Sequence, residues 1–211
     1  MSRCTTARSF AAVECAPGEQ IGIDEPSGLR IRAICHDDLL DEELLARIAR
    51  WREREQDYHP TQFEVTLEGT RSWLAHTVLG DPSRVMFVVV APGGRAVGHL
   101  GLAHADWEAR TAALSGVLTG EREQMPAGAM TRCVATLLAW AYRDVGLTSV
   151  WVVPFTDNAR VIRLLDRVGF VDDELIPLRR HVSPGRVDYR VCEAGDHEPP
   201  DRLWRRMVHR P

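Results

Sequence analysis

The sequence predicts an α/β fold, and three observations carry this prediction. Residues 29–33 alternate apolar side chains with arginines, which is the period of a half-buried strand. Two apolar runs, 85–91 and 96–103, flank a Pro-Gly-Gly-Arg turn and indicate a hairpin. Residues 128–145 place apolar side chains along one helical stripe. Strands and helices of this kind are expected to pack in layers around one core.

Length and composition favour one domain. A chain of 211 residues suits a single substantial domain, which we expect over 28–194, with a mobile leader over 1–27 and a C-terminal tail over 195–211. No stretch reaches the roughly 18 apolar residues that span a bilayer. The apolar run of the leader, 10–13, is too short for a signal-peptide core. We therefore expect a soluble, cytoplasmic protein.

Charge and cysteine content limit the function classes. All 26 basic residues are arginine, and the formal net charge of -4 argues against general attraction to nucleic acid. The C-terminal part is locally rich in arginine, which we interpret as a solvated face. The five cysteines form no Cys-x-x-Cys pair, so neither a zinc site nor a disulfide framework is expected, and Cys133 is assigned to the core.

Two further helices are expected before the hairpin. A His-Asp-Asp segment at 36–38 supplies helix-starting residues before the apolar spacing of 39–48. Residues 58–65 show no period and are expected to be irregular, whereas 67–79 repeat an apolar side at helical spacing. After the hairpin, 111–119 is expected to form a third strand of the same meander.

The second half of the chain repeats the alternation of helix and strand. The helix over 128–145 precedes a nearly continuous apolar strand at 150–155, and a further helix covers 158–168. Each of these helices is followed by a glycine that can cap it. Residues 173–193 indicate a final hairpin, and the tail is expected to end in a short helix around Trp204.

One loop has the features of a phosphate cradle. It joins a strand ending near Thr119 to the long helix, and residues 125–130 are mostly small. Small side chains let the backbone approach a pyrophosphate, and the unpaired N–H groups and dipole of the helix attract its negative charge. Pro126 has no N–H to donate, however, and an ordinary Ala-rich helix start would look similar. The loop alone leaves both interpretations open.

The segments that follow this loop carry a more specific pattern: Asp157-Asn158-Ala159-Arg160, Leu164-Leu165 and Arg167-Val168-Gly169-Phe170. They closely resemble the Asn-x-x-Ala/Ser, Leu-Tyr/Leu and Gly-Phe segments of the Gcn5-related N-acetyltransferases (GNAT). Gly128-Ala129-Met130-Thr131 is similar to the loop of the branch that contains ribosomal-protein N-terminal and nucleotide-amino-sugar acetyltransferases. The loop departs from the wider family pattern, since Met125 replaces its Arg or Gln. The likeness covers about residues 29–191.

The resemblance implies a GNAT-like fold, in which a mixed, mostly antiparallel central sheet is flanked by helices. The sheet would contain a strand splay, where the strand before Asn158 diverges from the strand before the phosphate loop. The resulting cleft would hold the pantetheine arm of acetyl-CoA, the acyl donor. Asn158 would hydrogen-bond to the donor, although a helix N-cap is an equally adequate role for it. The residues implied to bind the donor are Val117, Leu118, Thr119, Met125, Ala127, Gly128, Ala129, Met130, Thr131 and Asn158.

Two positions depart from the family's catalytic pattern. Many members carry a carboxylate before the phosphate loop and a tyrosine after Asn158, where this chain has Ala113 and Leu165. The two-residue strand period places His104 and Asp106 on one face and His99 on the other. Histidine has the pKa best suited to a general base, although exposed histidines at strand ends would look the same. The candidate catalytic residues are His104, His99, Asp106 and, on the thiolate side, Ser115.

The acceptor wall in such enzymes is formed by the first helix and the segment after it. The candidate substrate contacts are therefore Arg52, Glu53, Tyr58 and His59. Arg52 could bind a phosphate through two hydrogen bonds, which would suit a nucleotide sugar. A solvated arginine on a helix is the alternative interpretation.

These features predict an N-acyltransferase that moves an acetyl or other acyl group from acyl-CoA to a primary amine of a small molecule, such as an amino sugar or a natural-product intermediate. The protein is expected to act as a monomer or homodimer, without a metal or a membrane. Three alternatives remain: a protein N-terminal acetyltransferase, a non-catalytic acyl-CoA-binding module, and an acyltransferase that uses an aminoacyl-tRNA donor.

Overall fold

The structure is a computed structural model that describes residues 10, 20–23, 28–193, 195–196 and 198–211. Its helices are α1 (Glu42–Arg54), α2 (Leu67–Trp73), α3 (Ala129–Trp140) and α4 (Ala159–Val168). Its strands are β1 (Gln20–Gly22), β2 (Arg30–Ala33), β3 (Thr61–Phe63), β4 (Val85–Val90), β5 (Ala96–Asp106), β6 (Thr111–Thr119), β7 (Ser149–Val152), β8 (Val171–Ser183), β9 (Arg186–Val191) and β10 (Arg202–His209). None of the helices in these ranges is long and apolar enough to cross a membrane.

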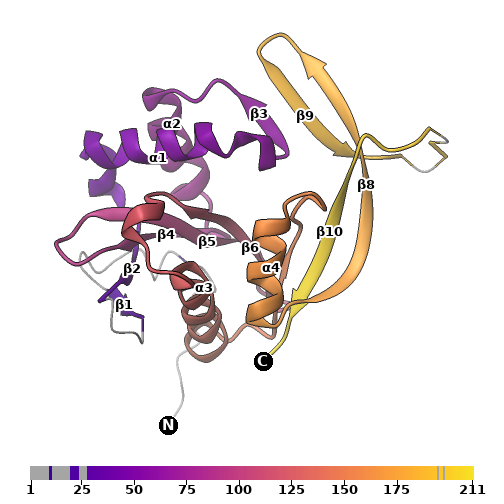
Figure 1. Cartoon of the computed structure of the whole chain (residues 1–211). Coiled ribbons are helices and arrows are strands. Elements are labelled where there is room, and N and C mark those ends of the chain that lie inside the picture. Colours follow the sequence, from indigo (N-terminus) through magenta and orange to yellow (C-terminus); the bar gives the residue numbers. More distant parts are fainter. Residues whose placement is uncertain (1–9, 11–19, 24–27, 194, 197) are drawn as a thin grey trace.

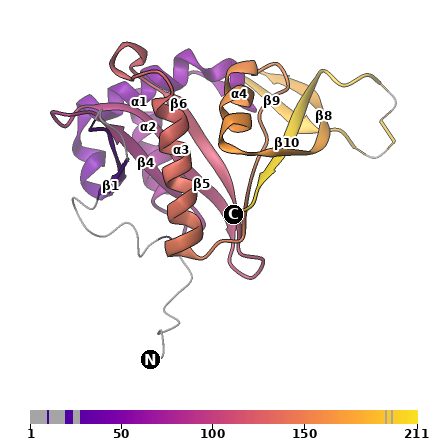
Figure 2. The same ribbon diagram turned by 60° about the horizontal axis from the view of Figure 1, so that its bottom comes forward.

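The strands form one sheet in the order β1-β2-β4-β5-β6-β7-β10-β8-β9-β3. Neighbouring strands are antiparallel except β6 and β7, which are parallel. Helices α1 and α2 cover one face, and α3 and α4 lie beside each other on the opposite face (Figures 1 and 2). The mixed, mostly antiparallel sheet flanked by helices that the sequence predicts is confirmed.

Each face of the sheet has its own hydrophobic core. Alternate residues of β4 show the division: Phe87 packs with the α3 and α4 side chains, whereas Val88 packs with α1 and α2. The larger core contains Cys133, buried as predicted, and Leu165 of α4. The smaller core is centred on Trp51, whose side chain is fully buried. The two-residue strand period thus assigns neighbouring side chains to opposite layers.

Local sequence signals determine most element boundaries. The α1 helix begins after Asp41, whose carboxylate accepts a hydrogen bond from the Leu44 N–H at 2.9 Å. The helical segment that continues α3 ends at Gly146, and α4 ends at Gly169; both glycines have left-handed backbones, with φ of 83° and 102°. Asn158 caps α4 by accepting from the Val161 N–H at 3.2 Å. These boundaries agree with the sequence prediction.

Three segments were predicted incorrectly. The predicted tail with a helix at Trp204 is wrong, because Arg202–His209 form β10, an inner strand that pairs with β7 and lies beside β8, as Figure 1 shows for β8. The segment 58–65 contains β3, which pairs with β9. Within the predicted leader, Gln20–Gly22 pair with β2, and Phe10 is buried against Trp107. Each of these segments pairs or packs with residues distant in sequence, which a local period does not reveal.

The arginine-rich C-terminal part is solvated only in part, because Arg180, Arg186, Arg190 and Arg210 are exposed whereas three other arginines form ion pairs in half-buried positions. Arg179, Arg202 and Arg205 pair with Asp196, Asp157 and Asp172, at 2.8, 2.8 and 2.5 Å. Arg202 also stacks on Phe155, with 3.6 Å between the guanidinium carbon and the ring centroid. The positive charge of these three arginines is therefore balanced by neighbouring carboxylates.

Candidate active site

A cavity of about 800 Å³ lies where β6 and β7 separate. The two strands pair only from Thr111 opposite Ser149 to Ala113 opposite Trp151. Beyond that point β7 ends at Val152. The residues that follow it hydrogen-bond to β10 and not to β6, since the Arg205 N–H donates to the Pro154 carbonyl at 2.8 Å. The later part of β6 is thus left beside an open gap. This is the strand splay that the family resemblance implies.

The cavity has walls on both sides of the sheet. On the α3 and α4 side it is lined by Val117, Met130, Asn158, Val161 and Leu164, which we call the donor half. On the α1 side it is lined by Tyr58, His59, His104, Trp151, Trp204 and Arg206, which we call the acceptor half. The cavity therefore passes from one face of the sheet to the other at the splay, alongside the exposed edge of β6.

The predicted donor-binding residues fall into two groups. Val117, Leu118, Thr119, Met130 and Asn158 line the cavity. The others lie at or near the start of α3 and do not line its walls: Met125 is packed in the core, Ala127 and Gly128 are exposed, Ala129 is buried and Thr131 is half-buried.

The start of α3 has the backbone geometry of an anion site. Gly128 is its N-cap, with a left-handed φ of 77°, and a Cβ built there would meet only the Arg132 guanidinium, at 3.4 Å. The Ala129 N–H donates to the Pro126 carbonyl, and the first helical bond runs from Arg132 to Gly128. The helix itself does not use the N–H groups of Met130 and Thr131. These groups and the helix dipole favour a negatively charged ligand.

Two arginines that the sequence analysis did not single out lie at the mouth of the donor half. Arg122 and Arg160 both line the cavity. Arg122 pairs with Glu55 at 2.7 Å, and Glu55 is also 3.1 Å from Arg54. Burial, together with the nearby Arg122 charge, lowers the pKa of Arg160. Excess positive charge at this mouth suits a phosphate-bearing ligand.

The end of β6 is fastened to α1. Arg54 donates to the carbonyls of Thr119 and Gly120, at 2.8 and 3.0 Å. The Trp51 indole N–H donates to the Glu121 carboxylate at 3.2 Å. Gly120 lies against the indole ring, where a Cβ would come within 2.2 Å of a ring carbon. This packing requires glycine and holds the strand end at a fixed position beside the cavity.

A β-bulge interrupts β6 at the splay. His99 of β5 pairs with Leu118 and Gly101 pairs with Ser115, so β6 contains one extra residue there, and Gly116 has a left-handed φ of 61°. The His99 Nδ1 lies 2.7 Å from the Gly116 carbonyl oxygen. Because a carbonyl only accepts, Nδ1 carries the proton. The planar trans peptide then directs the Val117 N–H away from His99.

His99 is buried, with an exposed fraction of 1%. Burial lowers the pKa of His99 to about 3, against the opposing effect of the Gly116 hydrogen bond. Its Nε2 is buried and has no hydrogen-bond partner among the described residues. A neutral imidazole with this pKa does not take a proton from an amine at neutral pH. His99 is therefore poorly suited to the role of general base.

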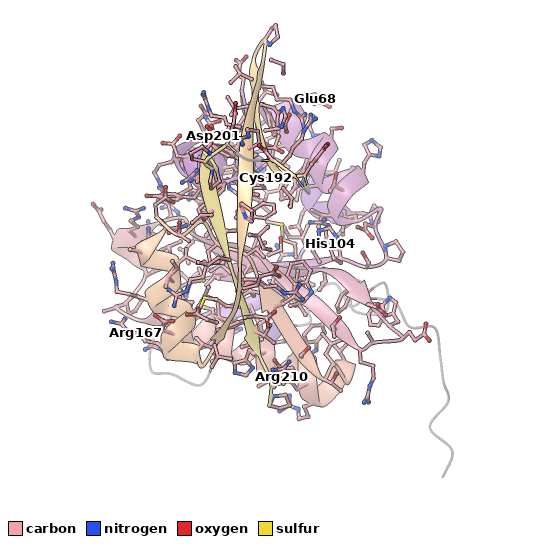
Figure 3. All side chains as sticks on the ribbon, turned by 90° about the vertical axis from the view of Figure 1, so that its right-hand side faces the viewer. Glu68, His104, Arg167, Cys192, Asp201 and Arg210 are labelled. Atoms are coloured by element: carbon pink, nitrogen blue, oxygen red, sulfur yellow. The ribbon has the colours of Figure 1, made fainter. Side chains whose placement is uncertain are left out.

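His104 occupies a different position. It is exposed, lines the acceptor half and stacks near Trp151, with 6.4 Å between ring centroids. Figure 3 shows it near the centre of the view, between the sheet and the α1 and α2 layer. A second bulge, between Ala103 and Asp106, and a φ of 53° at His104 turn its side chain toward the α1 side. The expectation that His104 and His99 face opposite ways is therefore wrong.

Among the other candidate catalytic and substrate residues, some line the cavity and others do not. Ser115 lines the cavity, whereas Asp106 caps the following turn by accepting from the N–H groups of Glu108 and Ala109. Arg52 lies outside the lining and stacks on Trp73, 4.1 Å from the ring centroid. Glu53 accepts from the Val65 N–H at 3.2 Å. Arg52 and Glu53 therefore connect α1 to the segments that follow it.

Tyr58 and His59, two of the candidate substrate contacts, line the acceptor half. Burial and the neighbouring Arg52 charge lower the pKa of His59, whereas Glu55 acts in the opposite direction. Trp151, Trp204 and Arg206, which also line this half, were not predicted as site residues. Trp204 and Arg206 belong to the strand that was interpreted as a tail.

An α/β sheet with a splay, a helix N-terminus and a cavity open to both faces defines an enzyme that brings two substrates together. A family model described as an acetyltransferase (GNAT) domain matches residues 29–171, more than half of the chain. The chain belongs to this family, and it is an acetyltransferase. Its co-substrate is acetyl-CoA.

Solved structures share the fold. The spermidine N-acetyltransferase from Vibrio cholerae in complex with CoA and spermine superposes with a TM-score of 0.63 and 14% identity, covering 86% of this chain and 95% of that chain. A dodecameric structure of spermidine N-acetyltransferase from Vibrio cholerae has a TM-score of 0.58 and 14% identity, covering 86% and 93%. A comparison with curated protein sequences found no match.

Proposed function

We propose that the protein transfers the acetyl group of acetyl-CoA to the primary amine of a small molecule. The observation that carries this proposal is the cavity through the splay, which is lined by Arg122 and Arg160 at the mouth of the donor half and by the acceptor half on the other side of the sheet. A donor in one half and an acceptor in the other would meet at the β6 bulge. Holding both in this way replaces an encounter in solution by a positioned reaction.

The chemistry requires few protein groups. The amine nitrogen attacks the thioester carbonyl carbon, the C–S bond breaks, and the amine loses one proton as CoA leaves as the thiol. We propose that the Val117 N–H stabilises the developing oxyanion. The carbonyl of the same peptide, that of Gly116, points the opposite way, toward His99. We assign proton removal to His104, the exposed histidine of the acceptor half. Ala113 and Leu165 line the cavity but cannot exchange protons.

The closed acceptor wall favours a small molecule over a peptide. β3 pairs with β9, and the Tyr189 N–H donates to the Pro60 carbonyl at 2.8 Å. Arg202 of β10 donates to the Asp57 carbonyl at 2.7 Å. These bonds join the segment after α1 to the C-terminal strands across the side of the cavity. A protein N-terminus would need an open groove in this place.

The similar solved structures are described as spermidine N-acetyltransferases, and at 14% identity they support the fold alone. Spermidine is a polyamine with several positive charges. Among the described residues, the only carboxylate that lines the cavity is Glu55, which pairs with arginines. The charges of this cavity therefore do not favour a polyamine as acceptor.

The proposal is tested by supplying the purified protein with acetyl-CoA and a panel of primary amines, and measuring CoA thiol release together with the mass of the acetylated product. We expect amine-dependent release of CoA and an amide product. Tight acetyl-CoA binding without amine-dependent release would instead support a non-catalytic binding module. Absence of acetyl-CoA binding, with ribonuclease-sensitive activity, would support an aminoacyl-tRNA donor.

A further inference from the structure

The acceptor half combines two indole rings with a guanidinium group. In β10, Trp204 lies opposite Ile176, and Val208 lies opposite Trp151 of β7. Residues 204, 206 and 208 share one face of their strand by the two-residue period. Trp151, Trp204 and Arg206 therefore project from neighbouring strands into the same chamber, which they all line. These walls suit a flat apolar group next to a charged one.

The Arg206 guanidinium retains hydrogen-bonding capacity. The guanidinium carbon, Cζ, lies 5.5 Å from the Trp151 ring centroid, and Nε is 3.1 Å from the Asp173 carboxylate. Nε is buried and has no hydrogen bond of acceptable geometry, and no hydrogen bond joins Nη1 or Nη2 to any residue that the structure describes. The Arg206 side chain is 40% exposed. A planar fork of donors in this position matches an oxyacid anion.

The acceptor half has no carboxylate of its own to balance a second cation. Among the described residues that line the cavity, Glu55 is the only acid, and its carboxylate is held by Arg54 and Arg122 at the donor mouth. Asp173, which pairs with the Arg206 Nε, does not line the cavity, so a second ammonium group in the acceptor would meet the guanidinium and no carboxylate of the cavity wall. An acceptor with an anionic group would gain a charge-assisted pair there.

We infer that the acceptor is a primary amine that carries a flat apolar group and an anionic oxyacid group, a carboxylate or a phosphate, with Arg206 binding the anion. This inference rests on the proposed function, because it concerns the acceptor half of the same cavity. Arg206 determines specificity in this scheme and takes no part in proton transfer. Trp151 and Trp204 contact the apolar part of the acceptor.

Four matched probes test this charge preference. They share one benzylic amine and differ in the para group: 4-(aminomethyl)benzoate, 4-(aminomethyl)phenylphosphonate, 4-(aminomethyl)benzamide and 1,4-bis(aminomethyl)benzene. We expect kcat/KM to be at least about tenfold higher for an anionic probe than for the neutral amide, and lowest for the diamine; a tenfold ratio corresponds to about 1.4 kcal/mol. The benzoate and phosphonate together show which anion is preferred. A diamine that reacts as fast as the anionic probes would overturn the inference.

Arg206→Gln is the test variant, and Arg205→Gln is its matched control. Arg205 is the adjacent arginine of β10, pairs with Asp172 and does not line the cavity. We expect Arg206→Gln to remove the advantage of the anionic probe while leaving the amide probe within about twofold and the KM for acetyl-CoA unchanged. Arg205→Gln is expected to keep the full preference. An unchanged preference in Arg206→Gln would also overturn the inference.

Binding to the CoA-loaded protein separates this inference from the proposed function. Calorimetry with the same probes measures selectivity without turnover. Tighter binding of an anionic probe than of the diamine, without acetylation of any amine, would support the anion site and contradict the proposed function. Acetylation of the diamine in preference to the anionic probes would support the proposed function and contradict the anion site.

Discussion

The Nδ1 atom of His99 lies 2.7 Å from the carbonyl oxygen of Gly116, and this bond holds the extra residue of β6 in its left-handed conformation. His99 is thus placed to orient the peptide between Gly116 and Val117. The N–H group of that peptide is the one that we propose to bind the oxyanion. The effect of His99 on the reaction would be indirect, through the strand that it holds.

Variants of His99 are expected to separate rate from stability. His99→Asn retains a donor near Nδ1 but leaves a void, whereas His99→Phe fills the ring space and loses the donor. We expect kcat to fall by about ten- to a hundredfold in His99→Phe, a smaller loss than deletion of an oxyanion donor causes. His99→Asn is expected to keep most of kcat despite a lower free energy of unfolding. If kcat follows stability in both variants, the role of His99 is packing alone.

The same histidine should make stability depend on pH. The unfolded chain takes up a proton on His99 below about pH 6.5, whereas burial keeps the folded form neutral until its pKa of about 3 is reached. The free energy of unfolding contributed by this group is therefore complete above pH 6.5 and falls as the pH decreases, by up to about 1.4 kcal/mol per pH unit. Urea unfolding between pH 7.5 and 4.5 should show a shallower decline in His99→Phe than in the wild type. Parallel profiles would contradict the assignment.

Gly128→Glu is expected to abolish binding of acetyl-CoA, because it adds volume and negative charge where phosphate must approach the backbone. Gly146→Glu is the matched control, since Gly146 also has a left-handed φ, of 83°, and follows the same helical segment. A Cβ at Gly146 meets no atom within 4 Å. Both variants carry the same backbone strain, so calorimetric loss of acetyl-CoA binding should occur only in Gly128→Glu. Equal affinities in two folded variants would remove the α3 N-terminus from the donor site.

Arg160→Gln is expected to raise the KM for acetyl-CoA by about tenfold and to leave kcat nearly unchanged, because a phosphate contact at the mouth is made before and during the reaction. Arg163→Gln is the control, since Arg163 lies one turn further along α4 and does not line the cavity. The difference between the variants should shrink as salt is added. A KM that is unaffected in Arg160→Gln would assign this arginine to the surface.

His104→Ala is expected to lower kcat/KM for the amine by roughly a hundredfold, the lower end of the contribution of general-base catalysis. The affinity for acetyl-CoA should not change, because His104 lines the acceptor half. His76→Ala replaces an exposed histidine outside the cavity lining and serves as control. Full activity of His104→Ala across a pH series would mean that the amine proton leaves through water.

The sequence was most informative where structure depends on local period. The strand Thr111–Thr119 agrees with its predicted bounds, and α4 begins at the predicted Asn158 cap, because alternation and capping are properties of adjacent residues. β10 was missed because its two partners, β7 and β8, lie earlier in the chain and its own eight residues contain few buried side chains. Register across distant strands is set by tertiary packing.

In the candidate site, too, local segments were predicted and contacts between distant segments were missed. The family-like segments identified β6, Met130 and Asn158, which line the cavity. Arg122 and Arg160 stood in or beside those segments without any pattern to distinguish them from other arginines. Arg206 could be identified only after β10 was placed beside β7. The positions that the sequence missed are those brought together by chain segments far apart.

The position of β10 between β7 and β8 has a consequence for biosynthesis. Both neighbours leave the ribosome before β10, so they must wait with unpaired edges until residues 202–209 emerge and insert between them. Trp204 and Arg206 enter the cavity wall in that same step. Until β10 inserts, the acceptor half therefore lacks the wall that Trp204 and Arg206 supply. Until then the open edges are exposed to association with other chains, as unpaired strands are in general.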